Sequence, residues 1–422
     1  MNTIKKPKIA LLSIRNTYNY GGVLSSLKVM HDFCQQYFEP TVFFLGFDQE
    51  IATSIKRLKF TSTEKKLTYF GMHCVEIGAR WAFWEPGHYA YTIKTWQKLL
   101  CDFDYFIVVS GTCIAAHPVA LLDKPFMQWI GTPYHEDRAE RVKKLTGIRA
   151  LINALASRPM ENIEKEILEK ASYTLAISSY AKQRFEEITQ KQNFVTCGYP
   201  VDCSKTASII SGISGTNNNK EKIILAVGRF SDPRKNVEML VAAFEKIYAQ
   251  DKNCLLYVVG KQPINETMNQ LSTSKCFENI IFTGQLSMAD LTALYQRSSL
   301  MLITSHQEGL GIVGLEAMLH GTPVIATKCG GTQDYVIENI TGHLVDINDA
   351  QTMATKALLL LENYDLLTIM GKNARDYIKK HFSLESIHEQ FKTGLIKTYP
   401  ELNVLFDEAR LKNQELQDQV NL

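Results

Sequence analysis

Short apolar runs alternate with amphipathic stretches along the whole chain. Runs of this length, rich in Val and Ile and closed by Gly or Ser, are typical of strands buried on both faces of a sheet. The segments between them are long enough for helices, which indicates βαβ units and parallel sheets. The expected strands form two series, one at 8–14, 41–47, 105–111, 125–131 and 173–179, the other at 222–230, 254–260, 279–286, 300–305 and 322–329.

A polar segment separates the two series. Residues 204–222, SKTASIISGISGTNNNKEK, are rich in Ser, Gly and Asn and have no helical or strand period. Such a composition is typical of a linker. We therefore predict an α/β protein with two Rossmann-like, doubly wound parallel-sheet domains that face each other across a cleft. The first domain covers 1–203, the linker 204–221 and the second domain 222–382.

The C-terminal end predicts two helices, one at about 383–399 and a polar one at 400–422, separated by Pro400. The last helix has only a thin apolar stripe at helical spacing. A solvated helix and a helix that binds a partner both fit this pattern.

The composition is that of an ordinary globular protein. The chain has 422 residues, of which 45% are hydrophobic and 21% charged, with a formal net charge of +2. A chain of this length is too long for a single hydrophobic core, which predicts two domains. The small net charge argues against nucleic acid as a partner. The nine cysteines never form a C-x-x-C pair, which favours reduced thiols over disulfides or a zinc site.

No segment has the length of a membrane span, and the apolar run in MNTIKKPKIALLSI is too short for a signal peptide. We expect a cytoplasmic protein, and peripheral contact with the cytoplasmic face of the membrane stays open. Basic and aromatic residues mix at 57–96. This segment fits an acceptor groove, a face against a bilayer or a helical hairpin packed on the core.

Residues 308–325, EGLGIVGLEAMLHGTPVI, place two glutamates in an otherwise apolar stretch. The glycines predict a helix from Ile312 to about His320, since Gly321 stops it and Pro323 prevents its continuation. A helix start rich in glycine suits a phosphate. Glu308 lies just before this start, and Glu316 lies inside a helix that is buried nearly all round. A ribose diol would satisfy the Glu316 carboxylate, as would a buried Arg or a solvent gap.

A second candidate element follows the strand at 222–230, in AVGRFSDPRKNVEMLVAAF. Arg229 and Lys235 could reach the same strand end, where two cations would bind a diphosphate. Arg234 is the alternative for either role. Such residues are also common as plain surface charges.

These stretches together carry a resemblance. The pattern VGRF…RKN…SHQEGLGIVGLEAMLHGTPVIATKCGGTQDYV…TGHLVD resembles family 4 of the retaining glycosyltransferases with the GT-B fold. The resemblance is specific over 222–346 and weaker in YGGVLSS (20–26), AISSYAKQRF (176–185) and GYPVD (198–202). FSLESIHEQF is similar to the family's C-terminal helix, which returns to the first domain.

The resemblance implies a role for each candidate residue. Arg229 and Lys235 would bind the diphosphate of a nucleotide sugar, Glu316 the ribose, and Glu308 would face the sugar ring. The turn after Glu308 would contact sugar or phosphate oxygens, and Gly284 to Leu286 would lie near the base. The donor-binding candidates are Gly21, Gly22, Arg229, Lys235, Gly284, Leu286, Glu308, Gly309, Leu310, Gly311 and Glu316, and the catalytic candidates are Glu308, Lys235, Arg229 and His135.

The first domain departs from the family pattern. The family often has a His at a strand end of this domain, but here His135 lies four residues late and His117 is a second candidate. Asp334 stands where the family more often has Glu. Asp102 and Asp104 form an Asp-x-Asp pair, a metal motif in other glycosyltransferases. This pair precedes its strand instead of following it, so we expect no metal site there.

The expected function is a hexosyltransferase that moves a sugar from a UDP- or GDP-linked donor to an acceptor hydroxyl with retention. The acceptor would be a glycan or a lipid-linked molecule in cell-surface polysaccharide, lipopolysaccharide or glycolipid synthesis. No cofactor or metal is expected beyond the nucleotide sugar. The alternatives are a non-catalytic nucleotide-sugar-binding module of the same fold and a phosphorylase with pyridoxal phosphate. A dinucleotide dehydrogenase is unsupported, because no G-x-G-x-x-G follows either first strand.

Overall fold

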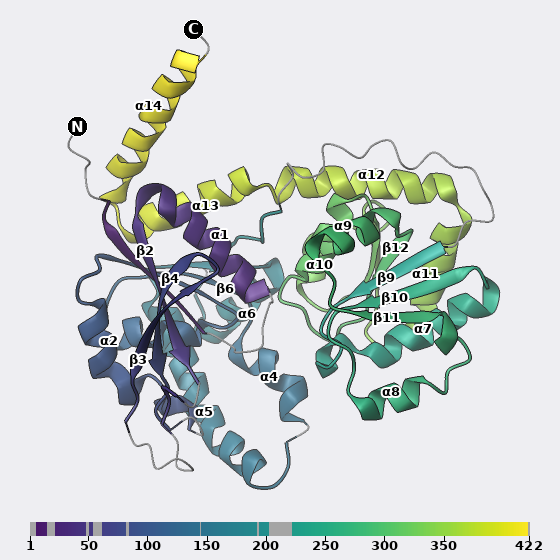
Figure 1. Cartoon of the computed structure of the whole chain (residues 1–422), viewed down its shortest axis with the longest axis horizontal. Helices are drawn as coiled ribbons and strands as arrows, with labels where there is room; N and C mark the ends of the chain where they lie inside the picture. The colour runs from purple at the N-terminus through teal and green to yellow at the C-terminus, as the bar shows by residue number, and fades with distance from the viewer. Residues whose placement is uncertain are drawn as a thin grey trace. The chain divides into compact units, whose positions relative to one another are not determined.

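A computed structural model describes residues 6–14, 22–47, 50–53, 61–81, 84–143, 145–191, 194–201 and 222–420, without the side chains of 140–141 and 412–420 (Figure 1). The chain divides into two compact units, Met1–Cys197 with Ile387–Leu422, and Gly198–Ser386. Each unit has one sheet covered by helices, so the predicted α/β class with two parallel-sheet domains is confirmed. The predicted linker at 204–221 lies outside the described residues.

The first unit has an eight-stranded sheet in the order β3-β4-β2-β1-β5-β6-β7-β8. All neighbouring strands pair in parallel except β3 and β4. The strands are β1 (Lys8–Ile14), β2 (Glu39–Gly46), β3 (Glu64–Tyr69), β4 (Met72–Gly78), β5 (Tyr105–Ser110), β6 (Met127–Ile130), β7 (Tyr173–Ala176) and β8 (Phe194–Thr196).

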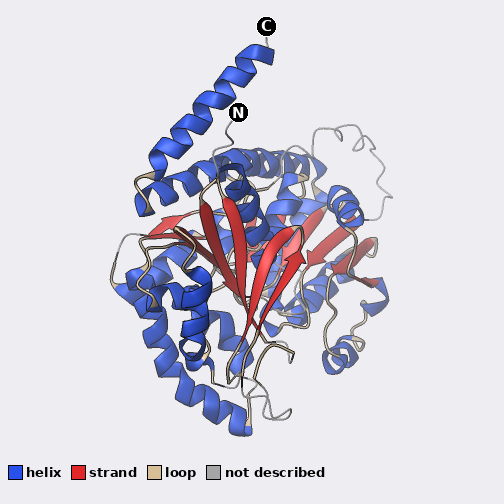
Figure 2. Ribbon diagram, turned by 60° about the vertical axis from the view of Figure 1, so that its left-hand side comes forward, coloured by secondary structure: helices blue, strands red, loops and turns tan. Residues whose placement is uncertain are grey.

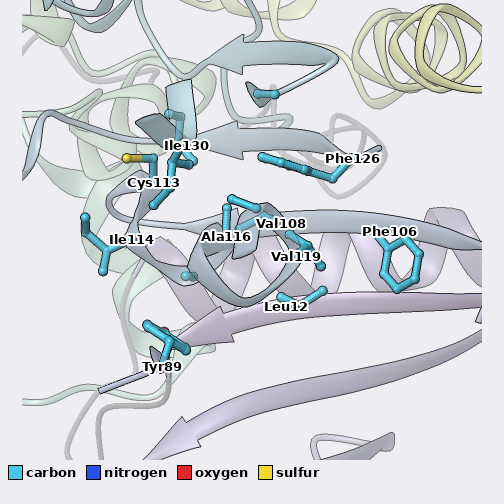
Figure 3. Close-up of a cluster of buried hydrophobic side chains, with 14 of the residues drawn as sticks. Leu12, Tyr89, Phe106, Val108, Cys113, Ile114, Ala116, Val119, Phe126 and Ile130 are labelled. Carbon is cyan, nitrogen blue, oxygen red and sulfur yellow. The ribbon is translucent and has the colours of Figure 1, made fainter. Parts of the chain in front are cut away.

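The helices of this unit are α1 (Gly22–Tyr37), α2 (Ile93–Leu100), α3 (His117–Leu121), α4 (Tyr134–Val142), α5 (Gly147–Lys170), α6 (Ser179–Thr189), most of α13 (Leu384–Thr398) and α14 (Leu402–Val420). Short 3-10 turns occur at η1 (Glu85–Gly87), η2 (Ala90–Thr92) and η3 (Cys113–Ala116). Strands and helices together enclose the core, in which Leu12, Val108 and Ile130 from neighbouring strands meet Ile114 and Val119 (Figure 3).

The segment 57–96 is not a helical hairpin, so that alternative was wrong. It holds the antiparallel strands β3 and β4, then η1, η2 and the start of α2. Phe70 and Gly71, both with positive φ (50° and 75°), form the two-residue turn between the strands, as the right-handed strand twist favours. Two of its aromatic side chains, Tyr89 and Trp96, are buried in the core.

The C-terminal residues pack on the first unit. In α13 the ring of Phe391 lies 4.9 Å from that of Trp129 and 5.4 Å from that of Phe33. Tyr399 donates its hydroxyl proton to the Pro125 carbonyl at 2.6 Å. This helix is therefore part of the first core, although it follows the second unit in sequence.

The second unit has a six-stranded sheet in the order β11-β10-β9-β12-β13-β14. Figure 2 shows the strands of the chain in red and the helices around them in blue. Every neighbouring pair is parallel. The strands are β9 (Lys222–Val227), β10 (Cys254–Val259), β11 (Ile280–Gly284), β12 (Leu300–Ile303), β13 (Val324–Thr327) and β14 (Gly342–Val345). The helices are α7 (Val237–Gln250), α8 (Asn265–Leu271), α9 (Met288–Arg297), α10 (Ile312–Leu319), α11 (Ala350–Glu362) and α12 (Tyr364–His381), with 3-10 turns η5 (Pro233–Lys235), η6 (Phe277–Asn279) and η7 (Gly331–Asp334).

Strand β9 lies between β10 and β12 in the second sheet. Because the strands are parallel, the loops that follow β9 and β12 both leave the sheet at the carboxyl ends of the strands. Those two loops carry Arg229, Lys235 and Glu308. In the described part of the chain, no helix combines the length and the apolar character that a membrane crossing requires.

Candidate functional site

The loop between β9 and α7 is held by its own side chains. The Asp232 carboxylate accepts a hydrogen bond from the Arg234 amide at 3.1 Å and caps η5. Asn236 adopts a left-handed conformation (φ 48°), and its side chain caps α7 by accepting from the Met239 amide. These two caps fix the backbone on either side of Lys235.

This loop is bonded to the loop after β12. Thr304 donates its hydroxyl proton to the Lys235 carbonyl at 2.9 Å, and the His306 amide donates to the Arg234 carbonyl at 2.8 Å. These bonds hold the two loops together, although Lys235 and Glu308 are 73 positions apart in sequence.

The structure brings Lys235 and Glu308 together as an ion pair. The Lys235 Nζ lies 2.5 Å from Glu308 Oε1, and Ser305 donates its hydroxyl proton to the same oxygen at 2.6 Å. The two side chains are only 17% and 12% exposed. Burial by itself would raise the pKa of Glu308, but the Lys235 ammonium and the Ser305 hydroxyl hold that pKa below its usual range. Glu308 is therefore an anion at neutral pH, with Lys235 as its counterion.

Arg229 and Arg234 both form ion pairs with Asp232. The Asp232 carboxylate lies 2.8 Å from the Arg234 guanidinium and 4.0 Å from that of Arg229. Arg234 is 14% exposed and Arg229 is 43% exposed. Arg229 thus presents more of its guanidinium to solvent than Arg234, the alternative for the same role.

The start of α10 depends on glycine. Gly311 caps the helix with φ 78°, and its carbonyl accepts from the buried Tyr335 hydroxyl at 2.9 Å. The Glu308 backbone is bonded on both sides to the loop after β13, since its amide donates to Cys329 and its carbonyl accepts from Gly331. A Cβ at Gly331 would lie 2.2 Å from the Gly309 carbonyl oxygen. The turn at 309–311 is therefore closely packed against rigid backbone.

Glu316 has a partner that the sequence did not indicate. Its Oε2 accepts a hydrogen bond from the hydroxyl of Tyr295 at 2.9 Å. Tyr295 lies in α9, is 2% exposed and stacks on the ring of His320. Burial raises the pKa of Glu316, and the Tyr295 hydroxyl only partly offsets this effect. The partner seen here is thus a tyrosine instead of the arginine considered above, and the pair joins α9 to α10.

The remaining candidates of the second unit also lie at the carboxyl ends of strands. Gly284 ends β11 with φ 70°, its carbonyl accepts from the Gly260 amide at 2.8 Å, and Leu286 follows half-buried. Asp334 lies in η7, where its carbonyl accepts from the Tyr377 hydroxyl.

In the first unit, the two histidine candidates differ in environment. His135 is the second residue of α4, is 41% exposed, and its Nε2 lies 3.3 Å from a Glu161 carboxylate oxygen. His117 opens α3 in the core, where burial lowers its pKa to about 4 and keeps it neutral near pH 7.

Gly22 is the first residue of α1, and Gly21 lies outside the described residues. Asp102 and Asp104 precede β5, at the amino end of that strand. Among the described residues, no three His, Cys, Asp or Glu side chains form a group that could hold a metal ion.

Known proteins resemble this chain in sequence and in fold. Residues 213–377 match the family model described as glycosyl transferases group 1. The N-acetyl-alpha-D-glucosaminyl L-malate synthase of Bacillus anthracis is 29% identical over 263 residues, which cover 60% of this chain and 68% of that protein.

Two solved structures are similar over nearly the whole chain. Sucrose-phosphate synthase from Thermosynechococcus elongatus has a TM-score of 0.71 at 19% identity, covering 94% of this chain and 100% of that one. Anabaena Alr3699/HepE in complex with UDP-glucose has a TM-score of 0.68 at 18% identity, covering 92% and 99%. The chain therefore has the GT-B fold, and residues 213–377, in its second unit, match the glycosyl transferases group 1 family.

Proposed function

We propose that this glycosyltransferase transfers a hexose from a UDP- or GDP-linked donor to a hydroxyl of a glycan or lipid-linked acceptor, with retention at the anomeric carbon. The observation that carries the proposal is the Lys235–Glu308 ion pair beside the glycine-opened start of α10. The UDP-glucose complex of a protein with the same fold supports a nucleotide-sugar donor. The relative that makes an N-acetylglucosaminyl product supports a hexose-type sugar.

The negative charge of the donor diphosphate would replace part of the negative charge that Glu308 now places beside the Lys235 ammonium. Arg229 would contribute a second cation, and the amides at Gly309 to Gly311 would donate to sugar or phosphate oxygens. Glu308 would then turn its carboxylate to the sugar hydroxyls. This exchange keeps the half-buried ammonium paired in both states, which limits the cost of desolvation.

Glu316 would accept hydrogen bonds from the ribose hydroxyls. The Tyr295 hydroxyl fixes one of its oxygens, so the carboxylate is oriented before the donor arrives. Gly284 to Leu286, at the end of β11, are our candidates for the contact with the base.

During transfer, negative charge grows on the departing diphosphate. Lys235, Arg229 and the start of α10 would stabilise this charge. The departing phosphate oxygen would take the proton of the acceptor hydroxyl. His135 is our candidate for a catalytic residue in the first unit.

Thermal unfolding with UDP-, GDP- and ADP-sugars tests the donor class. A ligand at 100 times its dissociation constant adds about 2.7 kcal/mol to the free energy of unfolding, so the correct donor raises Tm. Product analysis by NMR then reports whether the donor is hydrolysed or transferred and whether the configuration is retained. Binding without turnover would favour the non-catalytic module instead.

Lys235→Ala tests the role of the ammonium. We expect transfer activity to fall by at least about 100-fold, the range for removing one group that stabilises transition-state charge. Lys328→Ala is the matched control, since Lys328 is 52% exposed and pairs with Asp346 in the same unit. Full activity of Lys235→Ala would remove that residue from the proposed site.

A further inference from the structure

The first turns of α5 expose three large aliphatic side chains. Ile148 is 75% exposed, Leu151 59% and Leu155 60%. None of the residues 147–155 is buried, and the buried positions of the helix begin at Ala156. The N-terminal part of α5 therefore contributes little to the core, in contrast to the part that follows.

These three side chains lie on one face. Their spacing of three and four residues places them one above the other along a helix. Pro159 lacks the amide that would bond to the Leu155 carbonyl, which weakens the helix where the packed part begins. In Figure 1 the start of α5 lies at the periphery of the first unit, at the bottom of the view.

The charged residues in the sequence around the start of α5 have one sign. Between Glu140 and Glu161 the sequence has no acidic residue. It has five basic residues there, Arg141, Lys143, Lys144, Arg149 and Arg158, although the whole chain has a net charge of only +2. Among them, Arg149 and Arg158 are exposed on α5 itself. Their long stems can lie along an apolar surface while the charged ends reach phosphates.

Two exposed aliphatic residues of the second unit lack this combination. Leu359 and Ile369, in the second unit, are 51% and 58% exposed, and Glu362 and Asp365 lie in the sequence between them. In the segment 57–96, where a bilayer contact stayed open above, Tyr89 and Trp96 are buried. Of these three places, the start of α5 combines exposed aliphatic side chains with a sequence segment whose charged residues are all basic.

We propose that this face of α5 binds the surface of an anionic lipid bilayer, with Ile148, Leu151 and Leu155 inserted at the level of the head groups. An exposed apolar helix face bordered by Lys and Arg is the arrangement that binds such an interface. The basic residues between Glu140 and Glu161 complement lipid phosphates, each adding to the attraction near an anionic surface. The proposal concerns the first unit and is independent of the donor site proposed in the second.

Flotation of the full chain with vesicles tests this proposal. We expect binding to vesicles of phosphatidylcholine mixed with phosphatidylglycerol, weaker binding to phosphatidylcholine alone, and a decrease with added salt. Leu151→Ser/Leu155→Ser should weaken binding at least about tenfold, whereas the matched Leu359→Ser/Ile369→Ser should bind like the wild type. Arg149→Gln/Arg158→Gln should weaken binding severalfold and reduce its salt dependence.

Three results would overturn the proposal. They are absence of wild-type binding to the anionic vesicles, unchanged binding by Leu151→Ser/Leu155→Ser, and a concentration-dependent dimer in solution that this variant abolishes. The last result would assign the face to a second copy of the chain. Circular dichroism checks that the variants fold, and thermal protection by the donor should be the same in all of them. A failure here therefore leaves the proposed function untouched, and a failure of donor binding leaves the membrane result standing.

Discussion

Removal of one hydroxyl, in Tyr295→Phe, tests the carboxylate that we assign to the ribose. The Tyr295 hydroxyl donates to Glu316 at 2.9 Å inside the second unit. A hydrogen bond to a charged group contributes about 1.5–3 kcal/mol. We therefore expect the free energy of unfolding of this unit to fall by that amount at a pH high enough to ionise the Glu316 carboxyl.

The buried Tyr335→Phe is the matched control. Its hydroxyl also makes a 2.9 Å bond next to α10, but the acceptor is the neutral Gly311 carbonyl. A neutral bond contributes about 0.5–1.5 kcal/mol. Because burial raises the pKa of Glu316, its carboxyl becomes protonated as the pH falls, and the Tyr295 bond becomes neutral as well. The cost of Tyr295→Phe should thus shrink as the pH falls, while the cost of Tyr335→Phe stays constant.

The assay must report on the second unit alone. All four tryptophans, at 81, 84, 96 and 129, lie in the first unit, so their fluorescence does not follow the unfolding of the second. Urea-dependent hydrogen exchange of peptides from β9 to β13 gives the required free energies. Equal losses for both variants at every pH would refute the assignment of a charged, oriented Glu316. UDP affinity should also fall more than pyrophosphate affinity in Tyr295→Phe.

Two further substitutions test packing and ionisation elsewhere. Burial raises the pKa of Glu164 to about 7 against an ordinary value of 4.5, so its ionisation destabilises the fold as the pH rises from 4.5 to 7. At about 1.4 kcal/mol per pKa unit, the free energy of unfolding of Glu164→Gln should rise by about 3 kcal/mol relative to the wild type between pH 4 and pH 8. Tryptophan fluorescence in urea measures this difference. A difference that does not change with pH would contradict the raised pKa. Gly331→Ala places a Cβ 2.2 Å from the Gly309 carbonyl, so it should lower the free energy of unfolding by at least about 2 kcal/mol and weaken donor binding. Wild-type stability in hydrogen exchange would show that the turn can move.

The hydrophobic pattern predicted the fold class because parallel strands buried on both faces are continuous apolar runs. The helix expected from Ile312 to about His320 is α10, Ile312–Leu319, since Gly311, Gly321 and Pro323 define its ends through backbone conformation alone. Strands β3 and β4 were missed, because β3 has no buried residue, β4 is almost entirely buried, and the turn Phe70–Gly71 carries a bulky residue at positive φ.

The site was predictable only in part, for a related reason. Local glycines marked the α10 turn, but the Lys235–Glu308 pair joins residues 73 positions apart. Tyr295 belongs to a helix whose sequence resembles any amphipathic helix, and only the sheet order places α9 beside α10. Partners of buried carboxylates depend on such packing, which no local pattern encodes.

Hydrogen exchange in the presence of nucleotide tests the central claim most directly, that the loops after β9 and β12 form a donor site. With saturating UDP or GDP, we predict protection of peptides covering 229–236 and 305–316, and its loss in Lys235→Ala. A nucleotide that binds tightly yet protects neither peptide would contradict the account.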